Sequence, residues 1–193
     1  GTKLKGGVAN GFRAPNFNEL FFPDFGNPDL DAELSSEWNI GFEQNVWDDF
    51  FSLEAVYFDR RVNGLIEGVV IDPDNFIFQA QNKGRVDIRG VEVIPVLRPL
   101  PDLTLSGSFL FLDFVTSDGK LLRRPSERGT LHANYLRRNL WRGDDRLNCH
   151  LGLRVIGDRD DIDPLSGVTR TNAMFATTDV AISYSFLSSL APL

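Results

Sequence analysis

The chain has 193 residues, of which 42% are hydrophobic, and a formal net charge of -7 at pH 7. This length supports one globular domain, and the acidic balance, which no basic tail or arginine cluster reverses, argues against nucleic acid as a partner. A single cysteine excludes an intramolecular disulfide framework, and sixteen phenylalanines against one methionine are typical of β-strands.

Period-two alternation of apolar and polar residues predicts eight β-strands. We expect a bulge at Asn63-Gly64 in the third strand, and a bulge or strand end at Pro95 in the fourth, because proline cannot donate a ladder hydrogen bond. The eight strands are predicted at Thr2–Arg13, Trp38–Val46, Phe51 to about Val69, Ile77–Leu97, Leu103–Phe111, Thr130–Tyr135, Leu147–Val155 and Val180–Phe186.

The rest of the sequence gives no sign of another kind of structure. We find no helix of any length, no low-complexity tract and no linker. The N-terminal residues have neither the apolar core nor the cleavage site of a signal peptide, and no apolar run approaches the ~18 residues of a membrane helix. The sequence therefore predicts an all-β fold.

The lengths of the connections distinguish between two all-β architectures. A soluble sandwich and a membrane barrel give the same alternation along each strand. Short turns on one side of the sheet and long loops on the other are typical of outer-membrane barrels. The short connections are Trp47–Asp49, Pro99–Asp102 and Asn139–Asp145, and the long ones are Ala14–Leu34, Val70–Phe76, Thr116–Arg124 and Gly157–Asn172.

The three tryptophans support the barrel interpretation. Trp47 and Trp141 lie in short turns, and Trp38 lies near the long-loop end of its strand. Membrane barrels place such amphipathic rings in girdles at the two interfaces, whereas a sandwich core would place them in mid-strand. In this interpretation Leu147, Cys149, Leu151, Leu153 and Val155 face outward, and His150 and Arg154 face inward.

The connection from Gly11 to Leu34 is unusually rich in aromatic residues for a loop. Its prolines and the Gly26-Asn27-Pro28-Asp29 turn signal forbid a continuous strand or helix. Its rings either pack on one another or form part of a binding surface. The candidate ligand-binding residues are Phe17, Phe21, Phe22, Phe25 and Asn27.

Several motifs resemble those of TonB-dependent outer-membrane receptors, in particular the cobalamin and ferric-siderophore branch. They extend over nearly the whole chain and include Phe12-Arg13-Ala14-Pro15-Asn16-Phe17-Asn18-Glu19-Leu20, Gly26-Asn27-Pro28-Asp29-Leu30, Tyr57-Phe58-Asp59-Arg60-Arg61, Asn82-Lys83-Gly84, Gly90-Val91-Glu92 and Leu122-Arg123-Arg124-Pro125.

The resemblance implies that residues 1–193 are the C-terminal part of a larger, 22-stranded transmembrane barrel. The plug and the closing hairpin would be absent, and the remaining antiparallel up-and-down sheet of about eight strands would have two exposed edges. The implied function is energy-coupled import of cobalamin or a ferric siderophore across the outer membrane of a Gram-negative-type bacterium. TonB would be contacted through the missing plug, and lipopolysaccharide would be a further partner.

Other candidate chemistry is weaker. His132 and His150 share the polar phase of their strands, but no nucleophile or carboxylate stands at motif spacing, so we expect no enzyme, no cofactor and no metal site. Asp158–Asp163 lacks the glycine and distal glutamate of a calcium loop, and we interpret it as a solvated acidic loop. Cys149 is expected to be a small lipid-facing side chain. Arg123, Arg124 and Arg128 would suit lipopolysaccharide phosphates or ordinary solvated positions.

Two alternatives to a receptor stay open. A passive porin-like or structural outer-membrane barrel would keep the alternation without needing the aromatic loop. A soluble all-β carbohydrate-binding domain would fold in buffer without detergent.

Overall fold

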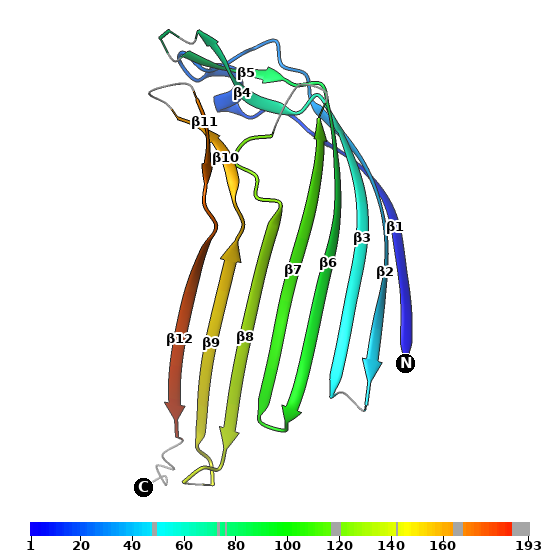
Figure 1. The fold of residues 1–193 in the computed structure, drawn as a ribbon, viewed down its shortest axis with the longest axis vertical. Helices are drawn as coiled ribbons and strands as arrows, with labels where there is room; N and C mark the ends of the chain where they lie inside the picture. The colour runs from blue at the N-terminus through cyan, green and yellow to red at the C-terminus, as the bar shows by residue number, and fades with distance from the viewer. Residues whose placement is uncertain are drawn as a thin grey trace, which may run out of the picture.

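The computed structural model describes residues 1–47, 50–72, 74–75, 77–116, 121–141, 143–163 and 168–186. Eight long strands form one antiparallel sheet in the order β1-β2-β3-β6-β7-β8-β9-β12 (Figure 1). The eight predicted strands are therefore confirmed. Their bounds are β1 Thr2–Arg13, β2 Glu33–Val46, β3 Phe51–Asn63, β6 Arg85–Leu100, β7 Leu103–Thr116, β8 Glu127–Arg138, β9 Arg146–Ile156 and β12 Phe175–Ser185.

Two predicted strands are longer than the strands of the sheet. β3 ends at Asn63. The next residue, Gly64, has a φ of 67°, a left-handed backbone conformation that residues other than glycine rarely adopt. The chain then forms a separate hairpin of β4 (Ile66–Asp72) and β5 (Ile77–Asn82). The interpretation of Asn63-Gly64 as a bulge was wrong, because the alternation continues through the break and hides the change of sheet.

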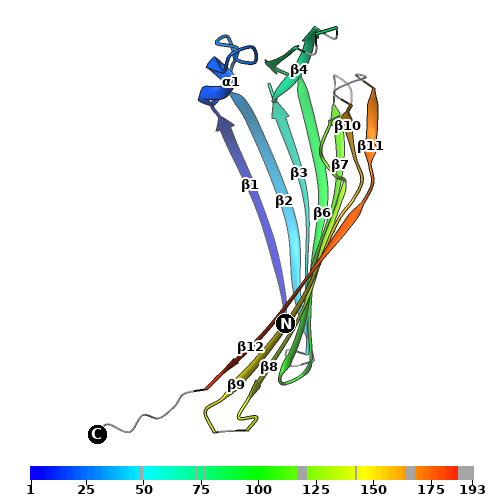
Figure 2. The ribbon, with the colours of Figure 1, turned by 90° about the vertical axis from the view of Figure 1, so that its left-hand side faces the viewer.

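The long connections also contain structure that the sequence did not predict. A five-residue helix, α1 (Phe17–Phe21), lies in the first of them. The predicted polar loop from Gly157 to Asn172 contains a second hairpin, formed by β10 (Arg159–Ile162) and β11 (Thr169–Asn172). Both hairpins and α1 lie at the long-loop end of the sheet (Figures 1 and 2).

Pro95 lies within β6 and is neither a strand end nor a bulge. It is opposite Leu53 on the β3 side, but the ladder to β7 has no paired residues between Val93 and Val96. The register shift of this ladder lies further along, between Leu97 and Leu100. A local gap in one ladder therefore accommodates the missing N–H group.

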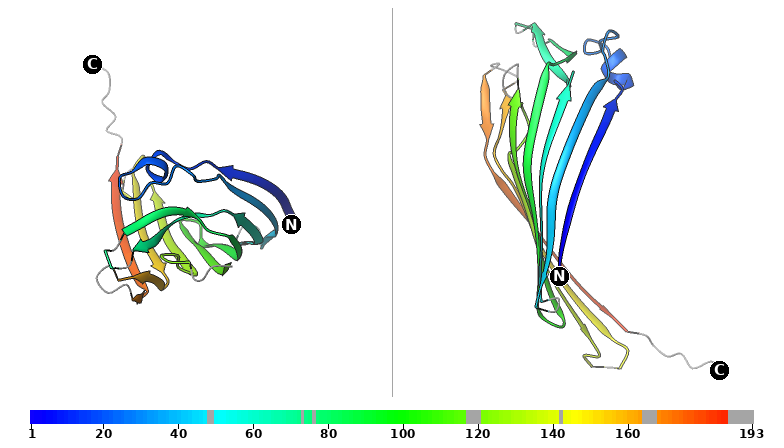
Figure 3. Two further views of the ribbon diagram at one scale, coloured as in Figure 1. Left: turned by 90° about the horizontal axis from the view of Figure 1, so that it is seen from above. Right: turned by 90° about the vertical axis from the view of Figure 1, so that its right-hand side faces the viewer.

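The two faces of the sheet have different chemistry. The strands bend into an arc, and the first long connection and the β4–β5 hairpin lie over its concave side (Figure 3, left). Residues paired across neighbouring strands share a face, so the register assigns Glu33, Arg128, His150 and Arg154 to this side. The concave face carries most of the charged, amide and histidine side chains of the sheet.

The convex face carries a broad apolar band. In a closed barrel this face would contact lipid, because the polar groups of the strands are then satisfied by their neighbours. The predicted outward phase of Leu147 to Val155 is confirmed by their register with β8 and β12. Large exposed side chains of the band are Leu4, Val8, Ile40, Phe42, Val91, Phe111, Leu131, Leu151, Val180 and Ile182.

The tryptophans mark the two borders of this band. Trp47 and Trp141 are each 75% exposed at the short-turn end, and Trp38 packs on Tyr57 with ring centroids 5.4 Å apart. Trp38 and Trp47 are nine residues apart, or roughly 23 Å along the membrane normal at ~3.3 Å per residue and ~40° tilt. An apolar band is ~25 Å tall in known barrels. The three rings therefore lie near strand ends, where two girdles are predicted.

The sheet is open within the described part of the chain. β1 and β12 are its two edges, and both the start of β1 and the end of β12 lie at the short-turn end (Figure 1). The turn at residues 48–49 and the C-terminal residues 187–193 lie outside the described ranges, as do residues 117–120 of the predicted loop from Thr116 to Arg124.

Candidate ligand site at the long-loop end

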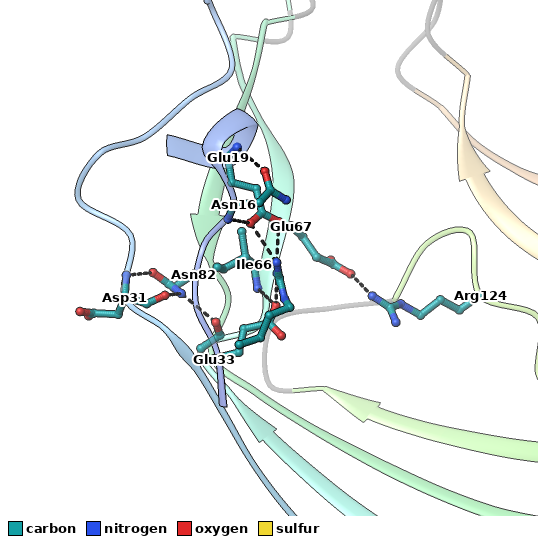
Figure 4. A network of polar contacts seen from close by, with 10 residues as sticks. Asn16, Glu19, Asp31, Glu33, Ile66, Glu67, Asn82 and Arg124 are labelled. Carbon is teal, nitrogen blue, oxygen red and sulfur yellow. Dashed lines mark hydrogen bonds and ion pairs between the residues drawn. The ribbon is translucent and has the colours of Figure 1, made fainter. Parts of the chain in front are cut away.

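Four segments meet at the long-loop end of the sheet. They are loop 1, defined here as residues 14–32, the β4–β5 hairpin, the segment of residues 121–126, and the β10–β11 hairpin. Figures 1 and 2 show them gathered at the same end of the strands. Their positions relative to one another depend on a set of polar contacts, part of which is drawn in Figure 4.

The first contacts fix the start of loop 1 above the sheet. Asn16 and Glu19 form a capping box, in which Asn16 Oδ1 accepts from the Glu19 amide at 2.9 Å and Glu19 Oε2 accepts from the Asn16 amide at 2.8 Å. Arg13 donates to both Glu19 and Glu33 from the end of β1. Glu33 also accepts from the Ile66 amide at 2.9 Å. The Arg13 guanidinium thus joins the sheet to α1, and Glu33 joins the sheet to the β4–β5 hairpin.

The second half of loop 1 is joined to β5 through main-chain and amide contacts. The Ala80 amide donates to the Phe25 carbonyl at 2.8 Å, and Asn27 Nδ2 donates to the Ala80 carbonyl at 3.0 Å. Asn82 Oδ1 accepts from the Asp31 amide at 2.8 Å, and Asn82 Nδ2 donates back to the Asp31 carbonyl at 2.9 Å (Figure 4). Ala80 is fully buried by this arrangement. Loop 1 and the hairpin therefore form one packed unit.

Ion pairs connect this unit to the other two segments. Glu67 of β4 lies 3.5 Å from Lys83 Nζ and 3.4 Å from Arg124 of segment 121–126 (Figure 4). Arg123 Nε donates to Asp161 Oδ1 of β10 at 2.7 Å. This hydrogen bond to Arg123 is the main cause that holds the pKa of Asp161 below its ordinary value.

These segments enclose a hollow of about 700 Å³. We call it the basic hollow, because four cations and one carboxylate lie on its wall among the residues that the structure describes. The cations are Lys83, Arg123, Arg124 and Arg128, the carboxylate is that of Glu67, and the two aromatic rings are those of Phe25 and Phe78. Aromatic faces and cations together can hold a planar or anionic small molecule.

The predicted ligand-binding residues of loop 1 occupy two different environments. Phe17, Phe21 and Phe22 are 74%, 56% and 55% exposed, and the rings of Phe17 and Phe21 lie 5.2 Å apart. Phe25 is half-buried, packs against Gly68 and lines the basic hollow. Asn27 uses its amide for Ala80 and its oxygen for the Asp29 amide. The structure brings Phe25 to the hollow and uses Asn27 to join loop 1 to β5 and to form the turn at Asp29.

Sequence reasoning missed the role of several residues around the hollow. Phe78 and Lys83 lie in a region predicted as a membrane strand, and their hairpin was not predicted. Arg123 and Arg124 pair with acidic residues of neighbouring segments, and Arg128 lies on the concave face. Of the two alternatives for these arginines, lipopolysaccharide contact stays a prediction, and the ion pairs show that Arg123 and Arg124 are not simply solvated. The phase of Arg128 with Thr130 and His132 along β8 was the available signal.

The remaining candidates for chemistry form no metal site. The rings of His132 and His150 stack at 5.5 Å, and His150 contacts Asn134 at 2.7 Å and Asp179 at 3.0 Å. In β10 and the residue after it, carboxylates are engaged by Arg123, Thr171 and Arg170 and are therefore less solvated than expected. Within the described ranges, no three His, Cys, Asp or Glu side chains are placed to hold a metal ion.

Among the described residues, no helix is long and apolar enough to span a membrane; the one helix, α1, has five residues. The antiparallel sheet has an apolar convex face, a polar concave face and long loops confined to one end. This combination defines the class of the chain as a piece of the wall of an outer-membrane β-barrel.

The chain belongs to the TonB-dependent receptor family. The family described as TonB dependent receptor-like, beta-barrel, matches residues 1–190. This is a family of receptors and transporters rather than of enzymes. The resemblance found in the sequence motifs is confirmed.

Individual relatives agree with this assignment. The vitamin B12 transporter BtuB of Vibrio vulnificus (strain YJ016) is 22% identical over 184 residues, which are 95% of this chain and 28% of the relative. The copper transporter OprC superposes with a TM-score of 0.70 at 18% identity, over 93% of this chain and 28% of OprC. The ferric yersiniabactin uptake receptor FyuA of Yersinia pestis gives 0.68 at 15% identity, over 94% of this chain and 27% of FyuA. The chain thus spans less than a third of the length of these proteins.

Proposed function

We propose that this chain forms part of the barrel wall and outer loops of an energy-coupled receptor that imports cobalamin or a ferric siderophore. The receptor would lie in the outer membrane of a Gram-negative-type bacterium, with the long-loop end outside the cell. The observation that carries the proposal is the basic hollow, where three loop segments and β8 present cations and aromatic rings to one space. BtuB and FyuA, named for vitamin B12 and ferric yersiniabactin, support these two ligand classes.

The proposal includes partners beyond this chain. Residues 1–193 would supply part of a barrel domain, and a plug domain elsewhere in the full-length receptor would fill the lumen and contact TonB. Lipopolysaccharide would contact the convex face above the apolar band. There, paired charges form a belt in which Arg89 lies 3.0 Å from Asp59 and Arg61 lies 3.1 Å from Asp87.

The structure favours a ligand-specific receptor over a passive porin-like barrel. A passive pore needs an open lumen, so it gains nothing from loops that pack over the concave side of the wall. Here Glu33, Glu67 and Asp161 each bind a group of a neighbouring segment and hold loop 1, the β4–β5 hairpin and the segment 121–126 together over the concave face. Ordering these loops costs conformational entropy. A binding site requires such ordering, because its side chains must be held in place.

The aromatic residues of loop 1 provide the test of ligand binding. We expect Phe25→Ala in the full-length receptor to weaken binding of the cognate ligand by about 5- to 150-fold, or roughly 1–3 kcal/mol, since Phe25 lines the hollow. Phe21→Ala and Phe22→Ala test the more exposed rings in the same titration. The amount of folded receptor should not fall. Unchanged affinity in all three variants would leave loop 1 as a structural lid and contradict its role in binding.

A further inference from the structure

The charge around the basic hollow differs from that of the chain as a whole. The chain carries a formal net charge of -7, yet the described residues that line this hollow are four cations and one carboxylate among uncharged side chains. Clefts with one sign of charge and poorly polarisable walls concentrate the field and attract ligands of the opposite sign. A surplus of positive charge at the mouth therefore favours an anion.

The four cations are not equally engaged. Lys83 and Arg124 share the single carboxylate of Glu67 at 3.5 and 3.4 Å, distances at the long end for an ion pair. Arg123 is held closely by Asp161. The Arg128 side chain has no hydrogen bond or ion pair with any residue that the structure describes. Arg128 is thus the guanidinium with the most capacity for a ligand, and Arg124 is the next.

Both arginines also line a second hollow of about 250 Å³ on the concave wall below. Its apolar lining consists of Phe58, Ile88, Leu112 and Phe114. A third arginine, Arg60, also lines it and is paired with Glu37. The Phe58 ring lies directly over Gly90, where an added Cβ would be 2.5 Å from the ring. Arg124 and Arg128 therefore lie where a polar mouth meets an apolar wall.

We infer that this junction selects an anionic ligand with an apolar or aromatic body, and that Arg128 is the residue that determines charge specificity. The inference rests on the proposed function and narrows it to negatively charged ferric siderophores, since cobalamin carries no net negative charge. The ligand's charge is held by the Arg128 guanidinium, with Arg124 joining as it exchanges Glu67 for the ligand. The apolar body lies on the wall around Phe58 and Phe114.

Two iron complexes of similar shape and different charge test the inference. The probes are the iron(III) complex of a tripodal tris-catecholamide, a trianion, and that of a tripodal tris-hydroxamate, which is neutral. The full-length receptor is titrated with each probe and with cobalamin. We expect the trianion to bind at least ~10-fold more tightly than the neutral probe, because charge-assisted hydrogen bonds to the arginines form only with the trianion.

Variants at Arg128 identify the residue responsible. Arg128→Gln should weaken binding of the trianion by about tenfold or more and leave the neutral probe unchanged. Arg128→Lys keeps the charge and should retain most of the affinity, which separates loss of charge from loss of folding. Arg61→Gln on the convex face makes the same chemical change away from the hollow and should change neither affinity.

The outcomes separate this inference from the proposed function. Binding of the neutral probe or of cobalamin as tightly as the trianion, or equal trianion affinity in Arg128→Gln and unaltered receptor, would overturn the charge selection alone. Binding of none of the three ligands would overturn the proposed function and the inference together.

Discussion

Arginine in place of Leu151 is expected to lower the free energy of unfolding of the full-length receptor in a bilayer by about 2–4 kcal/mol. Leu151 lies on the convex face between Ala133 and Val180, in the middle of the apolar band. A charged group there would contact hydrocarbon or force its neighbours to rearrange. The measurement is a reversible denaturant titration in lipid vesicles.

The matched control places the same side chain on the other face. Ala181 is exposed on the concave side of β12, opposite His150. Ala181→Arg should change stability by less than about 1 kcal/mol, because lumen-facing positions of a barrel accept charge. Equal losses at the two positions would contradict the assignment of the convex face to lipid.

Gly26→Ala is expected to prevent loop 1 from folding while leaving the barrel intact. A Cβ at Gly26 would lie 2.7 Å from the amide nitrogens of Phe21 and Phe22 and 2.8 Å from the Leu20 carbonyl carbon. These are backbone atoms, so the clash can be relieved only by moving α1, at a cost of about 1–3 kcal/mol or more. We expect ligand affinity to fall at least ~10-fold because Phe25, the preceding residue, lines the hollow.

Limited proteolysis of loop 1 and a ligand titration measure this effect. Cleavage within residues 14–32 should accelerate, whereas the thermal unfolding of the barrel should not change. Gly143→Ala is the control, because nothing lies within 4 Å of a Cβ added there. A Gly26→Ala receptor with unaltered cleavage and affinity would show that loop 1 does not order the site.

The sheet could be predicted from the sequence because its strands obey a single local rule. In β9, Leu147 to Val155 alternate without interruption, and the register places every one as expected. The break after Asn63 could not be predicted, because alternation continues into β4 and the change of sheet depends on the conformation of Gly64 and on the contact of Glu33 with Ile66. The end of a strand of this kind depends on contacts between residues that are distant in sequence, which alternation along one strand does not reveal.

The site was predictable only in part for the same reason. The composition of loop 1 identified Phe25, but the basic hollow also needs Phe78 of β5, Lys83 directly after β5, and Arg124 and Arg128 from the region around β8. No spacing in the sequence links these residues. They meet because Glu67 and Asp161 pair with Arg124 and Arg123 after the long connections fold back over the concave face.

The alternation along β9 can show directly whether this chain is part of a transmembrane barrel wall. Cys149 is replaced by serine, and single cysteines at successive positions from 147 to 155, leaving out Gly152, carry a nitroxide spin label in the full-length receptor in vesicles. In a barrel wall, oxygen, which partitions into lipid, should relax the labels at 147, 149, 151, 153 and 155, and a water-soluble nickel chelate should relax those at 148, 150 and 154. Exposure of position 151 to the chelate together with burial of position 154 in lipid, or an absence of alternation, would contradict the barrel-wall assignment.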